Sequence, residues 1–304
     1  MNRRDSLQLE VSLGDLLKLQ AEAQRLRLPS VRGRARRHPG QRPSPYHGRG
    51  LSFSEHRIYQ PGDDIRHIDW RVTARHNEPH TKCYEEERER PLLLVCDLTA
   101  SLVFSSGTAL KSHRVLEAAA ILIWLGLAQG DRVGAIVASP SGIESFRPAR
   151  RRQQALQILQ ALVRHHNNLI GSTDTEPGRL DESLSESART LKTGGRLMVI
   201  GDFLQIGEQT ETLMRRLASH NVATALRICD PLDLRAPPPG RYGLMGDHGP
   251  LWINAADPGF RDQLEERLSN YEQDLNRLFA RAGSHYFCHS TDSSLRPLLA
   301  NMAA

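Results

Sequence analysis

Short apolar runs alternate with helical segments along most of this chain, and this alternation limits the possible folds more than any other feature. Two runs, "PLLLVCD" at residues 91–97 and "RLMVIGD" at 196–202, are continuously apolar and end in Asp. Such runs are typical of strands whose sheet is covered on both faces. We predict further strands at residues 131–139, 142–148 and 222–229, the second as a short hairpin partner of the first. Helices are predicted at residues 108–130, 151–166, 179–192, 208–219 and 258–283. The alternation predicts an α/β fold with a doubly wound, mainly parallel sheet.

The first 80 residues differ in composition, and we treat them as an N-terminal segment before an α/β domain at residues 81–304. Ser12 and Asp15 resemble a capping box at the start of a helix over residues 12–28. The following arm, residues 31–50, contains prolines and glycines but no acid, which indicates an extended segment. Its arginines are Arg32, Arg34, Arg36, Arg37, Arg42 and Arg49. Residues 81–87 alternate weakly, and we predict that they form an edge strand.

The composition is that of a folded protein without a disulfide framework. The 304 residues carry a net charge of +5, which admits an acidic partner but does not require one. The four cysteines form no CxxC pair and are interpreted as buried thiols in a reducing compartment. No secretory signal is visible, and the longest near-apolar run, residues 116–128, is shorter than the ~20 residues of a membrane span. We therefore expect a cytoplasmic protein.

Oxygen-bearing side chains stand where the two apolar strands end. Asp97, Thr99 and Ser101 follow one strand, and Asp202 follows the other. If the two strands are neighbours at the point where strand order reverses, these side chains converge on one crevice. Oxygen ligands without His or Cys suit a hard cation such as Mg²⁺. The alternative is structural, because Asp, Thr and Ser at a strand end also cap the helix that follows.

Two motifs carry a resemblance to known families. "DLTAS", residues 97–101, resembles the D-x-S-x-S metal-ion-dependent adhesion site of von Willebrand factor type A domains, with Thr99 in place of Ser. "FSEHRIYQPGDDIRHIDWRVTAR", residues 53–75, is more specific. Together they resemble domain-of-unknown-function family 58, bacterial proteins associated with MoxR-type AAA ATPases. The similarity covers residues 48–206.

The resemblance implies a von Willebrand type A-like (Rossmann-like) fold and a set of metal ligands. Asp97, Thr99 and Ser101 would be first-loop ligands for Mg²⁺ or Mn²⁺, and Asp202 the later acidic ligand. The family pattern also expects a Thr from a middle loop. Thr173 is our preferred candidate and Thr175 the alternative, although the spacing places Gly178 near the expected position. A shifted or absent Thr would lower the affinity of the site for the metal ion, and the site could then be vestigial.

The resemblance also implies a function: a non-enzymatic interaction module that acts with a MoxR-type AAA ATPase and an unidentified client in a chaperone-like or assembly role. Two alternatives remain open. The arginine-rich arm could bind nucleic acid, weakly and without sequence preference. A metal-dependent hydrolase is less favoured, because HExxH, GxSxG and Walker lysine motifs are absent from the sequence. An aspartyl nucleophile at Asp97 is disfavoured because Thr99 stands where such enzymes have a second Asp.

The charged segment at residues 53–75 favours a structural interpretation. Pro61 and Gly62 suit the central positions of a turn. The segment interleaves three acids with three bases: Asp63, Asp64 and Asp69 with Arg66, Arg71 and Arg75. We expect ion pairs among these charges to hold an irregular segment in place.

Overall fold

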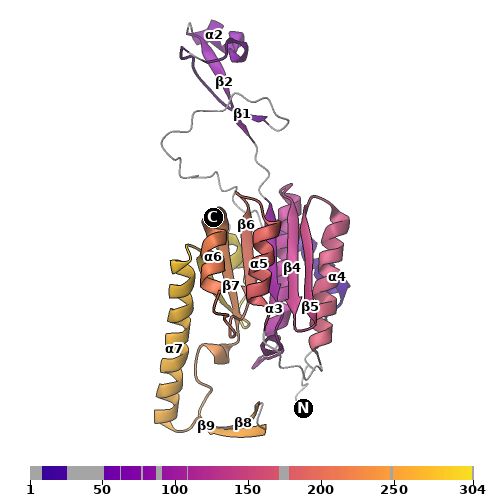
Figure 1. The fold of residues 1–304 in the computed structure, drawn as a ribbon, viewed down its shortest axis with the longest axis vertical. Helices are drawn as coiled ribbons and strands as arrows, with labels where there is room; N and C mark the ends of the chain where they lie inside the picture. Colours follow the sequence, from indigo (N-terminus) through magenta and orange to yellow (C-terminus); the bar gives the residue numbers. More distant parts are fainter. Residues whose placement is uncertain are drawn as a thin grey trace. The chain divides into compact units, whose positions relative to one another are not determined.

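The computed structural model describes residues 9–25, 51–61, 63–76, 78–86, 91–107, 109–170, 178–246 and 249–302. These residues form two compact units, which are described separately (Figure 1). The larger unit contains residues 9–25 and the described residues from 91 onward. The smaller unit contains the described residues between 51 and 86.

A six-stranded sheet forms the centre of the larger unit. Its strand order is β10-β7-β6-β3-β4-β5. The strands are β3 (Leu92–Asp97), β4 (Val133–Ser139), β5 (Gly142–Ala149), β6 (Arg196–Gly201), β7 (Val222–Cys229) and β10 (His285–Ser290). Only β5 within this sheet is antiparallel, and it pairs with β4 as the predicted hairpin partner. The predicted α/β class with a mainly parallel sheet is confirmed.

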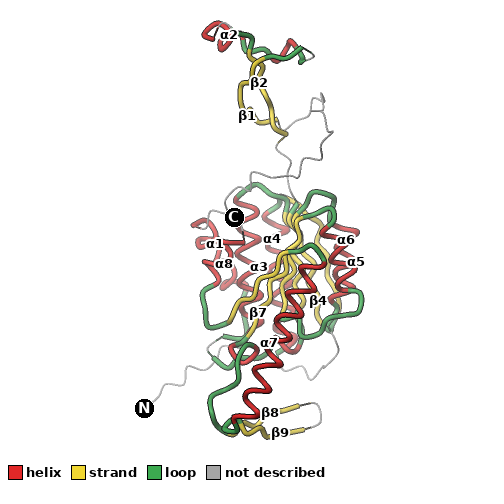
Figure 2. Tube along the Cα trace, turned by 90° about the vertical axis from the view of Figure 1, so that its left-hand side faces the viewer, coloured by secondary structure: helices red, strands yellow, loops and turns green. Residues whose placement is uncertain are grey.

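Helices cover both faces of this sheet (Figure 2). One face packs against α1 (Leu13–Arg25), α3 (Lys111–Ala128), α4 (Arg152–Leu169) and α8 (Leu295–Met302). The other packs against α5 (Leu180–Thr190), α6 (Thr210–Ala218) and α7 (Pro258–Arg281). In β3, Leu92 and Leu94 belong to the first core and Leu93 and Val95 to the second. This double burial is why the strand is apolar throughout.

The first helix, α1, packs within the larger unit. Ser12 and Asp15 form the predicted capping box, because the Asp15 N–H donates to Ser12 Oγ at 3.3 Å and the Ser12 N–H to Asp15 Oδ2 at 3.2 Å. Leu16 is buried in the core beside α3, and its carbonyl accepts a hydrogen bond from Trp124 Nε1 at 3.2 Å. The predicted boundary at residues 80/81 groups this helix with the segment that follows it, whereas the compact units group it with the large sheet.

The smaller unit is a two-stranded sheet with two short helices. Its strands are β1 (Leu51–Ile58) and β2 (His80–Glu86), and its helices are η1 (Ile65–His67) and α2 (Trp70–His76). The strand predicted at residues 81–87 is present as β2, which pairs antiparallel with β1. The arginine-rich arm lies outside the described residues.

The described contacts of the acids in the charged segment include Arg57, His56 and backbone donors. Asp63 Oδ1 pairs with Arg57 Nη2 at 2.6 Å, and Asp69 Oδ2 lies 3.0 Å from His56 Nε2. Asp64 caps η1 by accepting from the Arg66 N–H at 2.9 Å. The donor to Asp64 is only two residues away, and a short acidic side chain reaches such a backbone group readily. The predicted turn is present, since the Asp63 N–H donates to the Gln60 carbonyl at 3.0 Å.

Further elements close the larger unit. The hairpin β8 (Arg241–Gly246) and β9 (Gly249–Asn254) precedes α7, and the short helices η2 (Ala100–Leu102) and η3 (Pro231–Asp233) follow β3 and β7.

The thiols of Cys229 and Cys288, far apart in sequence, lie 2.9 Å from each other across β7 and β10. None of the helices within the described ranges combines the length and apolar character that a membrane crossing requires.

Candidate functional site

The candidate site lies at the carboxyl ends of β3 and β6. Asp97 is the last residue of β3, and Asp202 directly follows β6. The two strands are parallel neighbours, with Cys96 opposite Ile200. From β3 the chain continues to β4 on one side, whereas β6, β7 and β10 extend the sheet on the other. The two aspartates therefore stand where strand order reverses, the usual place for a ligand in such sheets.

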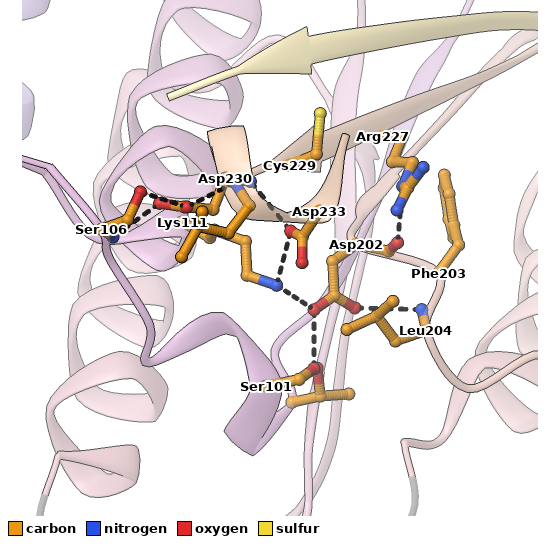
Figure 3. Close-up of polar contacts among 12 residues, drawn as sticks. Ser101, Ser106, Lys111, Asp202, Phe203, Leu204, Arg227, Cys229, Asp230 and Asp233 are labelled. Atoms are coloured by element: carbon orange, nitrogen blue, oxygen red, sulfur yellow. Dashed lines mark hydrogen bonds and ion pairs between the residues drawn. The ribbon is translucent and has the colours of Figure 1, made fainter. Parts of the chain in front are cut away.

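Three of the predicted residues are joined by a short chain of hydrogen bonds, and Figure 3 shows the bond between Ser101 and Asp202. Ser101 Oγ donates to Asp202 Oδ2 at 2.6 Å, and Thr99 Oγ1 lies 2.8 Å from Ser101 Oγ. The Thr99 and Ser101 hydroxyls do not cap the helices that follow, as the structural alternative would require. Thr99 precedes η2 but makes no side-chain cap, and the residue preceding α3 is Leu110.

Asp97 is a buried carboxylate with little compensation. Its exposure is 5%, and Oδ1 has no hydrogen-bond partner among the described residues. Burial, together with the negative charge of Asp202, raises the Asp97 pKa to about 7, although a backbone hydrogen bond from Arg179 opposes this. A positive charge at this place would stabilise the ionised carboxylate.

Asp202, in contrast, is fully engaged (Figure 3). Its Oδ2 accepts from Lys111 Nζ at 3.0 Å in addition to Ser101, and its Oδ1 accepts from the Leu204 N–H at 3.3 Å. Its backbone carbonyl accepts from Arg227 Nε at 3.2 Å. The next residue, Phe203, has a φ of 54°, a conformation that costs energy for a side chain of this size. The structure thus fixes Asp202 from several directions.

The sequence analysis did not identify Lys111, Arg227 or Asp233 as part of this site. Lys111 Nζ bridges Asp202 and Asp233, with Asp233 Oδ2 at 3.1 Å. Asp230, at the end of β7, accepts from the Ser106 N–H at 2.8 Å and so ties the loop after β3 to β7. One signal was available, and it concerns Asp230: an aspartate directly follows β7, as Asp202 follows β6, and another, Asp97, is the last residue of β3.

The middle loop is described only in part. Thr173 and Thr175 lie outside the described residues, so their participation stays a prediction. Gly178 is described and lies against the site: a Cβ there would be 2.7 Å from Thr99 Cγ2 and 3.1 Å from Asp97 Oδ2. The position that the spacing favoured is thus adjacent to the aspartate, but it offers no side chain.

Gly178→Ala is expected to destabilise the protein. The added methyl group would overlap Thr99 Cγ2, and overpacking of this kind costs about 1–3 kcal/mol. Gly107→Ala is the matched control, because nothing lies within 4 Å of its Cβ position. Urea unfolding of the two variants measures the difference. Equal stability would mean that the loop moves away from Asp97 without cost.

The chemistry of the donors fits a hard cation. The site offers two carboxylates and two hydroxyls, and one buried carboxylate oxygen is unpartnered within the described part of the chain. Mg²⁺ requires only one or two carboxylates, because it retains several waters. No group of three or more His, Cys, Asp and Glu side chains placed to hold a metal occurs in the described ranges. Any ion here would depend on hydroxyls and water as well as on acids.

The fold and this constellation define an α/β protein with a polar site at its topological switch point. Residues 55–273 match the family described as "Protein of unknown function DUF58". The chain belongs to this family, in agreement with the resemblance of its motifs.

Relatives and solved structures similar to the chain are distant. "Uncharacterized protein Rv1480" of Mycobacterium tuberculosis and "Uncharacterized protein Mb1516" of Mycobacterium bovis are each 29% identical over 253 residues, which cover 81% of this chain and 76% of the relative. BatB from Bacteroides thetaiotaomicron is 12% identical with a TM-score of 0.45, over 70% of this chain and 96% of BatB. The SpRpn10 VWA domain is 8% identical with a TM-score of 0.40, over 70% and 94%.

Proposed function

We propose that this protein is a non-enzymatic interaction module whose docking site is a divalent cation held by Asp97, Thr99 and Ser101 beside Asp202. The observation that carries the proposal is the Asp97 carboxylate, which is buried and has an unpartnered oxygen in the described structure. Mg²⁺ or Mn²⁺ would compensate its charge, and the neighbouring hydroxyls are ligands of the right chemistry. Thr173 is a candidate further ligand.

The proposed ligand of this site is a carboxylate on a partner protein. A bound cation supplies an open coordination position, which an acidic side chain of the partner can fill in place of water. Resemblance to the family favours a MoxR-type AAA ATPase as the partner, acting on an unidentified client. The non-enzymatic role agrees with the position of Thr99, two residues after Asp97, where phosphoryl-transfer enzymes with an aspartyl nucleophile have a second acid.

A pull-down of the cognate ATPase tests this function. Wild type should retain the ATPase in Mg²⁺ and lose most of it, roughly tenfold or more, in chelator, since truncating a central contact often costs above 1.4 kcal/mol. Asp97→Ala should bind poorly in both buffers. The matched control is Asp274→Ala, which removes an acid whose side chain is 69% exposed on α7 and should bind as wild type does.

Circular dichroism of each variant separates loss of binding from loss of folding. Asp97 ends its strand and does not lie within the apolar run, so Asp97→Ala should fold. A folded Asp97→Ala protein that retains full binding in chelator would contradict the proposal. Docking would then have to be sought in the charged segment at residues 53–75.

A further inference from the structure

Lys111 is placed where a lysine is costly. It is the first residue of α3, its exposure is 1%, and the first turn of the helix contains no acid. The positive end of the helix dipole disfavours a cation there, and burial removes the hydration of the ammonium group. Neither cost is offset by neighbours along the helix.

Two aspartates from other parts of the chain offset this cost. Lys111 Nζ lies 3.0 Å from Asp202 Oδ2 and 3.1 Å from Asp233 Oδ2 (Figure 3). The side chain of Asp202 is 4% exposed and that of Asp233 is 17% exposed, so the pair with Asp202 is the drier of the two. Lys111 therefore places a positive charge against the buried acid of the candidate site and shares it with Asp233.

The two acids of the site are consequently in different electrostatic states. Asp202 has a cationic partner inside the protein, whereas Asp97 Oδ1 has no partner among the described residues. A divalent ion that approaches Asp97 would meet an Asp202 carboxylate whose charge is already partly compensated by Lys111. The ammonium group would also repel the ion, and this repulsion is stronger in a partly dry site than in water.

We propose that Lys111 is an internal competitor of the divalent cation, which keeps the metal affinity of the isolated chain low. The inference rests on the proposed function, because it concerns the same site, and it adds the regulation of that site. An ion held weakly by the protein alone gains most from an added partner carboxylate. Metal and acidic partner then bind cooperatively, since each raises the affinity of the other by the same factor.

The test measures Mn²⁺ binding to the isolated full chain by calorimetry and thermal unfolding, without any partner. Lys111→Met should bind Mn²⁺ roughly tenfold or more tightly than wild type, because it removes the competing charge. In chelator it should also melt roughly 10 °C lower, because Asp202 becomes a buried unpaired acid, and Mn²⁺ should restore much of this loss. Lys111→Arg keeps the charge and should bind Mn²⁺ as wild type does.

Asp233→Asn supplies a second test that does not require removal of Lys111. Without Asp233, the ammonium group is shared by fewer acids and pairs more fully with Asp202. Mn²⁺ affinity should therefore fall a few-fold below wild type. If Lys111→Met cannot be folded even with Mn²⁺, this variant decides the question.

The inference is overturned if Lys111→Met binds Mn²⁺ no more tightly than wild type, or if Asp233→Asn binds as tightly as wild type or more so. These outcomes are distinct from failure of the proposed function. If Lys111→Met gains affinity while ATPase capture ignores chelator, the competitor role stands and metal-dependent docking is wrong. If ATPase capture requires metal but Lys111→Met gains nothing, docking stands and the competitor role is wrong.

Discussion

Asp97→Asn is expected to make the protein more stable than wild type at pH 8 in chelator. The Asp97 pKa rises to about 7 in the folded state because burial disfavours the charge, and it returns to about 3.8 on unfolding. Between these values the unfolded chain releases a proton that the folded chain retains, so wild-type stability falls as pH rises. The loss is about 1.4 kcal/mol per pH unit and levels off above pH 7, on the order of 4 kcal/mol in all.

Urea unfolding of both proteins at pH 5, 6, 7 and 8 measures this gap. The gap should widen up to pH 7 and then stay constant. Three buried histidines have the opposite effect on the pH dependence of stability, because burial lowers their pKa values in the folded state. The unfolded chain binds protons at these positions more readily, so their contribution to stability grows as pH rises. They are His165, His166 and His289. These histidines are common to both proteins, so their contribution cancels in the difference. Parallel stability curves would show that the Asp97 charge is compensated by another group in the folded protein.

Arg227→Met should cost the protein about 3 kcal/mol of stability. Arg227 is 1% exposed, donates to the Asp202 carbonyl at 3.2 Å, and pairs with Glu272. Removing one member of a buried ion pair costs about 3–5 kcal/mol. The lower figure applies because the side chain of Glu272 is 29% exposed and regains water. A melting temperature lower by roughly 6–12 °C should follow.

Arg277→Met is the matched control for this change. Arg277 lies on the same helix as Glu272, pairs with Asp274 at 3.1 Å, and its side chain is 62% exposed. Exposed pairs contribute about 0–1 kcal/mol, so the melting temperature should hardly move. If Arg227→Met is as mild as this control, the fold holds Asp202 without the guanidinium group.

Local sequence patterns were sufficient to predict most helices and strands of the larger unit. The long helix α7 lies within the predicted span 258–283, and its residues Leu275 and Phe279 are buried. Residues 142–148 were correctly predicted to pair with the strand before them. Patterns did not indicate which strands pair with one another. The strand predicted at residues 81–87 is present as β2 (His80–Glu86), and it pairs with β1 (Leu51–Ile58).

The sequence by itself determined the fold class and the candidate residues Asp97, Thr99, Ser101 and Asp202, because burial on both faces leaves a visible mark along each strand. Only the tertiary structure decided which groups surround these residues. Lys111 meets Asp202 across 91 residues of chain, at the end of a helix where sequence rules expect an acid. Gly178 offers Asp97 no side chain from its loop. Such contacts follow from the order of strands in the sheet, and a periodic pattern within one strand or helix contains no information about that order.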